Sequence, residues 1–124
     1  MTEVQELATF VEKARLGDLS PKALEQLKIR VLDTLGVAVG ALDAEPVNAI
    51  RGLLEDLGGT EQATLIGGGK TSPEKAAFFN SALSRYLDFM DAYLAKGETN
   101  HPSDNFGAVL AAAESVDASG AELL

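Results

Sequence analysis

The chain has 124 residues with no cysteine and a single histidine, and 10 Lys+Arg against 19 Asp+Glu give it a formal net charge of −9. This length fits one domain or a piece of a larger one, and the lack of cysteine excludes disulfides, cysteine-ligated metal clusters and a thiol nucleophile. The negative charge disfavours nucleic acid and anionic membranes as partners, and no stretch is apolar enough to span a bilayer.

Cap signals divide the chain into helices. Thr2 and Gln5 have the spacing of a capping box, in which two side chains bind each other's backbone amides. Ser20–Pro21 places a hydroxyl N-cap before a proline at the first helical position, where the missing N–H costs nothing. Ser119 and Glu122 repeat the capping box just before the end of the sequence. One helical turn does not offset the cost of nucleation, so we expect the sequence to be cut at the start of an element.

The second and third helices differ in their expected burial. Beyond Val31 the second helix is apolar on nearly every side, so we expect its C-terminal half to be buried. Gly36 and Gly40 each cost about 1 kcal/mol of helix propensity relative to alanine, which we expect close approach of another helix to offset. A short third helix begins at Pro46 and ends at Gly58.

A glycine-rich stretch follows the only strand candidate, the extended run Ala63–Ile66. Gly67–Gly69 is similar to a phosphate loop, but the P-loop spacing puts Thr64 where the first glycine should stand. Pro73 also begins the next helix only after the motif, so a turn is the favoured interpretation. That helix is long and apolar on one side, and it is expected to continue to Met90.

Two carboxylates lie near the end of this fourth helix. Asp88 and Asp91 are one helical turn apart, so they are expected to share a face. They are either solvated, which is the favoured interpretation for charges in general, or placed in a cleft. A cleft would raise a carboxyl pKa and suit general acid–base catalysis.

The stretch His101–Asn105 is dense in hydrogen-bonding groups and joins two helices. His101 is the only side chain here with an unperturbed pKa near neutrality, and a helix capped by Ser103 or Asp104 would offer amides to a carboxylate ligand. The structural alternative is a simple N-cap and a loop histidine. Asp88, Asp91, Lys96 and His101 lie within one helix end and its exit loop, which keeps the functional interpretation open.

These residues also carry a family resemblance. The segments Leu87–Tyr93 (LDFMDAY) and His101–Asn105 (HPSDN) resemble the MmgE/PrpD family, as do Arg30–Val37 and the stretch from Gly67 to Leu83. The HPSDN form is most similar to the family's 2-methylcitrate dehydratase branch. The resemblance implies a mostly helical domain joined to a smaller α/β domain, a homodimer, and no metal or other cofactor. Ala92 stands where the family normally has a hydroxylated residue.

The resemblance places the family's two aspartates on Asp88 and Asp91 and its active-site histidine on His101. We expect Asp88 and His101 to be catalytic, and we expect substrate binding by Asp91, Lys96, Ser103, Asp104 and Asn105.

Together these patterns predict an all-α fold in which residues 1–124 form a single helical segment, cut from the family's larger helical domain. The expected activity of the full-length cytoplasmic enzyme is dehydration of 2-methylcitrate or a similar tricarboxylate, with the segment alone inactive. The alternatives are a free-standing helical interaction module and a decarboxylase or epimerase of the same family.

Overall fold

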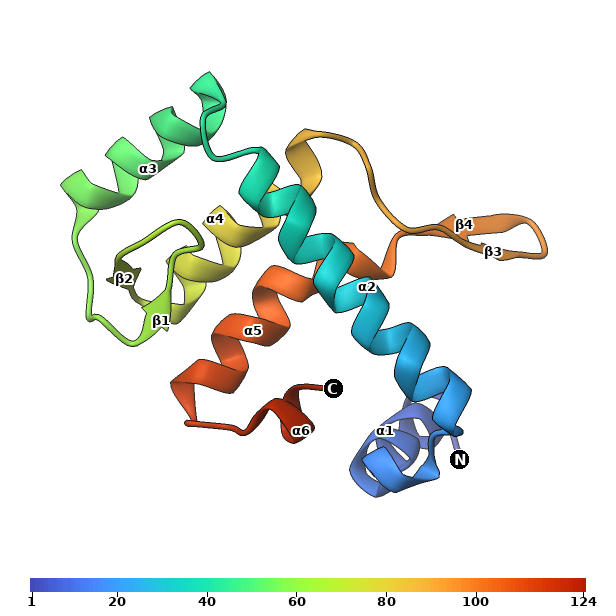
Figure 1. Ribbon diagram of the computed structural model, residues 1–124. Coiled ribbons are helices and arrows are strands. Elements are labelled where there is room, and N and C mark those ends of the chain that lie inside the picture. Colours follow the sequence, from blue (N-terminus) through green and yellow to red (C-terminus); the bar gives the residue numbers. More distant parts are fainter.

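The computed structural model describes all residues from 1 to 124, and helices make up most of it (Figure 1). The α-helices are α1 (Glu3–Lys13), α2 (Pro21–Gly40), α3 (Glu45–Leu57), α4 (Pro73–Tyr86), α5 (Phe106–Ser115) and α6 (Gly120–Leu123), and the two short 3-10 helices are η1 (Leu16–Asp18) and η2 (Pro102–Asn105). Two separate antiparallel hairpins pair β1 (Ala63–Thr64) with β2 (Lys70–Thr71) and β3 (Tyr93–Ala95) with β4 (Glu98–Asn100). The fold is therefore mostly helical, and the expectation of a single strand was wrong because it located only β1.

Three of the predicted capping signals form as expected. Thr2 and Gln5 exchange the two hydrogen bonds of a capping box, and the Ser20 hydroxyl caps α2. Ser119 and Glu122 form a second box at the start of α6. The Glu122 carboxylate accepts hydrogen bonds from the backbone N–H and the hydroxyl of Ser119. Both bonds, the backbone one more strongly, lower the pKa of Glu122 below its ordinary value. Local side-chain chemistry is thus enough to begin these helices.

The core lies around α4, which packs against α5, α2 and α3. Its members are Ala38, Ala41, Val47, Leu54, Ala63, Leu65, Ala76, Phe79, Leu83 and Ala111. The closest helix approach is at Gly107 of α5. A Cβ there would lie 2.6 Å from the backbone nitrogen of Ser81 and 2.9 Å from the carbonyl oxygen of Ala77. Only glycine lets α5 come this close to α4.

Polar side chains of α4 and α5 fix the β1–β2 hairpin to the helices. Asn80 is fully buried; its side chain accepts the N–H of Ile66 and donates to the carbonyl of Thr64. Glu114 of α5 accepts from both the backbone N–H and the hydroxyl of Thr64, at 2.7 and 2.6 Å. The glycine-rich stretch Gly67–Gly69 forms the connection between β1 and β2, as the turn interpretation predicted.

The C-terminal half of α2 is not buried as predicted. Only Thr34 and Ala38 are buried, whereas Leu32 and Val39 are 71% and 57% exposed. The physical reason is that α2 crosses α4 along a single face, so its other apolar faces have no element against them (Figure 1). The expected close helix approach is also absent at Gly36, where a Cβ would meet nothing within 4 Å.

Replacing Gly36 by alanine should therefore stabilise the protein. The residue lies inside a helix with open space around it, so the change gains helix propensity of about 0.5–1 kcal/mol without a clash. Urea denaturation should show an increase of this size in the free energy of unfolding. A decrease would mean that another surface covers this face of α2.

Helix α1 lies away from the core around α4, near the N-terminal end of α2 (Figure 1). Its apolar side chains Val4, Leu7, Phe10 and Val11 are each at least 63% exposed. None of the helices combines the length and the apolar character needed to cross a membrane. The apolar stripe of α1 is thus an unpartnered surface.

Candidate functional site

The fourth helix ends earlier than the sequence pattern suggested. It stops at Tyr86 rather than Met90, and Asp88 adopts a left-handed backbone conformation with φ of +58°. The expectation that Asp88 and Asp91 share a helical face is therefore wrong, because both lie in the loop after α4. Left-handed conformations of non-glycine residues carry a cost and cluster at functional sites. Asp88 is exposed at the start of this loop.

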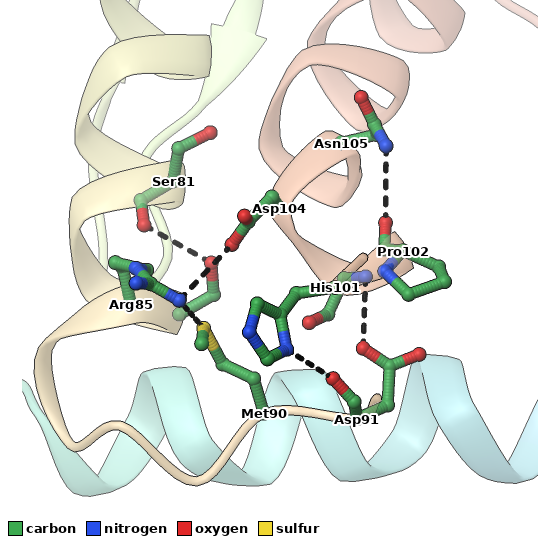
Figure 2. A network of polar contacts seen from close by, with 10 residues as sticks. Ser81, Arg85, Met90, Asp91, His101, Pro102, Asp104 and Asn105 are labelled. Carbon is green, nitrogen blue, oxygen red and sulfur yellow. Dashed lines mark hydrogen bonds and ion pairs between the residues drawn. The ribbon is translucent and has the colours of Figure 1, made fainter. Parts of the chain in front are cut away.

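Asp91 and His101 are in direct contact. The His101 Nδ1 lies 2.6 Å from the backbone carbonyl oxygen of Asp91 (Figure 2). Since a carbonyl only accepts, Nδ1 carries the proton, and in the neutral ring the lone pair is on Nε2. The Asp91 carboxylate accepts the backbone N–H of Ser103 at 3.0 Å. One residue thus orients the imidazole and fixes the start of η2.

The β3–β4 hairpin lies between these two residues in the chain. It projects from the body of the molecule (Figure 1). Asp91 and His101, which flank it in the chain, are in contact at its base (Figure 2). Lys96 is in the two-residue turn at its tip, beside Gly97, and is exposed to solvent. The structure therefore does not bring Lys96 to the same place as Asp91 and His101.

The start of α5 also differs from the prediction. Residues 102–105 form η2, and α5 begins at Phe106, so neither Ser103 nor Asp104 caps it. The Asp104 carboxylate instead pairs with Arg85 at the end of α4 (3.7 Å), and Arg85 also contacts the sulfur of Met90 (Figure 2). Asn105 donates to the carbonyl of Pro102. These contacts hold the segment that follows His101 against α4.

A cavity of about 210 Å³ opens beside this network, between α2, η2, α5 and the C-terminal residues. Its lining consists of Leu27, Arg30, Val31, Thr34, Asp91, Pro102, Ser103, Asn105, Phe106, Val109, Leu123 and Leu124. Three predicted site residues are among them, whereas Asp88, Lys96, His101 and Asp104 are not. The Ser103 Oγ is buried and has no hydrogen-bond partner. No three acidic or histidine side chains gather in a way that could hold a metal ion.

Sequence reasoning missed Arg30 and Thr34 as lining residues. They are four positions apart on α2, so they lie on the same face of that helix as Leu27 and Val31. A cation one turn before a hydroxyl was a usable signal.

Comparison with known proteins gives one family model and several relatives that share the same name. A sequence model of the family described as "MmgE/PrpD N-terminal domain" matches residues 5–124. A protein named probable 2-methylcitrate dehydratase from Saccharomyces cerevisiae is 33% identical over 113 residues, which is 90% of this chain and 21% of that protein. The 2-methylcitrate dehydratase of Escherichia coli K12 is 32% identical over 119 residues, 89% of this chain and 23% of the relative.

A third relative, the 2-methylcitrate dehydratase of Salmonella typhi, is 37% identical over 92 residues, or 68% of this chain and 18% of the relative. The chain therefore spans about a fifth of the length of the curated relatives that it matches. No solved structure gives a significant match.

Proposed function

Because this chain belongs to the MmgE/PrpD family, we propose that the protein carrying it is a lyase that removes water from 2-methylcitrate or a similar tricarboxylate. The observation that carries the proposal is the similarity to named 2-methylcitrate dehydratases along about nine tenths of the chain. The proposal includes a cytoplasmic homodimer, as the family resemblance suggests.

Dehydration of this kind needs two proton transfers. A base takes a proton from a carbon next to a carboxylate, the C–O bond to the hydroxyl group breaks, and the carbon–carbon double bond forms. An acid protonates the departing hydroxyl, which leaves as water. We propose His101 and Asp88 for these two steps, without assigning which residue performs which.

The geometry supports His101 in this role. Its Nδ1 proton is engaged by the Asp91 carbonyl at 2.6 Å, which fixes the tautomer and leaves Nε2 available for proton transfer. The second choice, Asp88, comes from the family resemblance, and this residue is exposed at the start of the loop that leads to Asp91. Asp91 then acts as a positioning residue, because its carbonyl orients His101 and its carboxylate holds Ser103.

A direct assay tests the proposed reaction. Protein expressed from the whole reading frame that contains this sequence should convert 2-methylcitrate to an unsaturated tricarboxylate, detected by the ultraviolet absorbance of the new double bond. Release of CO₂ would replace the proposal by a decarboxylase, and inversion of a stereocentre without loss of water would replace it by an epimerase. Those are the other activities that the family resemblance offered.

We also propose that residues 1–124 form one helical part of a larger helical domain. Only 17 of the 124 residues are buried, which is few for a chain of this size. The exposed apolar side chains of α1 and α2 support the proposal, since contiguous apolar surfaces of soluble proteins usually contact other protein.

A polypeptide of residues 1–124 should therefore bind a hydrophobic fluorescent dye, self-associate during gel filtration and show no turnover of 2-methylcitrate. Dye fluorescence and light scattering measure the first two properties. A monodisperse polypeptide that melts cooperatively without binding dye would instead support a free-standing interaction module.

A further inference from the structure

We infer that Arg30 binds a carboxylate of the substrate in the cavity between α2, η2 and α5; the inference rests on the function proposed above. Only two charged side chains line this cavity, Arg30 and Asp91. The Asp91 carboxylate already accepts the N–H of Ser103. The chain has one salt bridge, between Arg85 and Asp104, so the Arg30 guanidinium is not part of an ion pair. Arg30 is thus the free cation of the cavity.

The charge of the chain makes such a cation necessary for a polyanionic substrate. With 10 Lys+Arg against 19 Asp+Glu, the average field of the surface repels carboxylates. A local positive group is therefore needed wherever a tricarboxylate is to be held. The planar guanidinium can donate two parallel hydrogen bonds to a single carboxylate, which a lysine cannot do.

The polar groups of the cavity provide a second observation. The Ser103 Oγ is shielded from solvent and lacks a partner, whereas the Thr34 hydroxyl donates to the carbonyl of Arg30. Buried hydroxyl groups are nearly always hydrogen-bonded, and the Ser103 hydroxyl, which lines the same cavity as Arg30, is free to donate to a ligand there. A substrate carboxylate could accept from Arg30 and Ser103.

The size of the cavity agrees with this use. Its volume of about 210 Å³ is far above the roughly 10–15 Å³ that a single water requires. The remaining lining residues are mostly apolar, among them Leu27, Val31 and Val109. A few polar groups on an otherwise apolar wall are typical of sites for small organic molecules.

Binding of propane-1,2,3-tricarboxylate tests the inference apart from the reaction, because this compound has three carboxylates but no hydroxyl group to lose. Isothermal titration calorimetry on the protein from the whole reading frame should show that Arg30→Gln raises Kd about 10- to 100-fold. The Kd of Arg30→Lys should lie between those of the wild type and Arg30→Gln, since lysine keeps the charge but not the paired hydrogen bonds. In the assay, Arg30→Gln should raise KM for 2-methylcitrate more than it lowers kcat.

Two further variants serve as a comparison. Ser103→Ala removes only the hydroxyl and keeps the N–H that binds Asp91, so it should also weaken binding, by a smaller factor than Arg30→Gln. Lys22→Gln removes an exposed cation from the first turn of the same helix and outside the cavity lining, so its Kd should equal that of the wild type.

An unchanged Kd in Arg30→Gln, or a wild-type protein that does not bind the tricarboxylate, would overturn the inference. If the wild type binds in an Arg30-dependent way but does not dehydrate 2-methylcitrate, the proposed function fails and the assignment of Arg30 stands. If the wild type dehydrates the substrate and Arg30→Gln does so with unaltered KM, the assignment alone fails.

Discussion

Replacing His101 by alanine in the protein from the whole reading frame should lower kcat for 2-methylcitrate dehydration by about 10²- to 10⁴-fold, the usual contribution of a general acid or base. The imidazole is oriented through its Nδ1, so its loss removes the group that we propose for one of the two proton transfers. Stopped assays at saturating substrate would measure the decrease.

A matched control separates chemistry from folding. Thr99 lies on the exposed strand β4, two positions before His101, and Thr99→Ala should keep nearly full activity. Both variants should melt within a few degrees of the wild type. A His101→Ala enzyme with nearly wild-type kcat would remove His101 from the proposed mechanism.

The largest loss of stability is expected for Gly107→Ala. The new Cβ would lie 2.6 Å from the backbone nitrogen of Ser81, and a backbone atom cannot turn aside as a flexible side chain can. Forcing α5 away from α4 should lower the free energy of unfolding by about 1–3 kcal/mol, in spite of alanine's better helix propensity. The displacement should also lower activity, because η2 leads directly into α5.

Gly36→Ala is the matched control for this variant. The chemical change is the same and both glycines are in helices, but Gly36 has open space around it. In urea denaturation, the free energy of unfolding should therefore rise for Gly36→Ala and fall for Gly107→Ala. Equal effects would mean that the close packing of α5 on α4 does not set the stability.

Most helix starts, although not that of α5, could be predicted because their signals are local. Ser20, Pro46 and Ser119 each mark a start within one residue of the observed position, and Gly58 marks the end of α3. Capping depends on atoms a few residues apart, so the sequence alone contains the necessary information.

The end of α4 could not be predicted in the same way. Nothing in the residues after Tyr86 forbids a helix, and the left-handed conformation of Asp88 accompanies the packing of Leu87 against the core beside Gly40. The exposure of Leu32 has a similar origin, because an apolar pattern shows which faces could be covered and not which are.

The candidate site was predicted in part. The nearness of Asp91, His101 and Ser103 followed from their short separation in the chain, and the structure brings them together. The tip position of Lys96 depends on the β3–β4 pairing, which was interpreted only as a loop although a glycine follows Lys96 at the turn. Arg30 reaches the cavity from α2 through tertiary packing, which periodicity cannot indicate.

The length of the β3–β4 hairpin can change without moving the residues at its base. Both strands are exposed, and the contact between the Asp91 carbonyl and His101 closes the hairpin at its base. Adding or removing a pair of residues at the Lys96–Gly97 tip alters how far the hairpin extends and leaves its two ends adjacent. A fluorescent label attached at this tip would therefore lie outside the site, on a hairpin whose last strand leads directly to His101. Its fluorescence should respond to movement of the hairpin base without blocking the site.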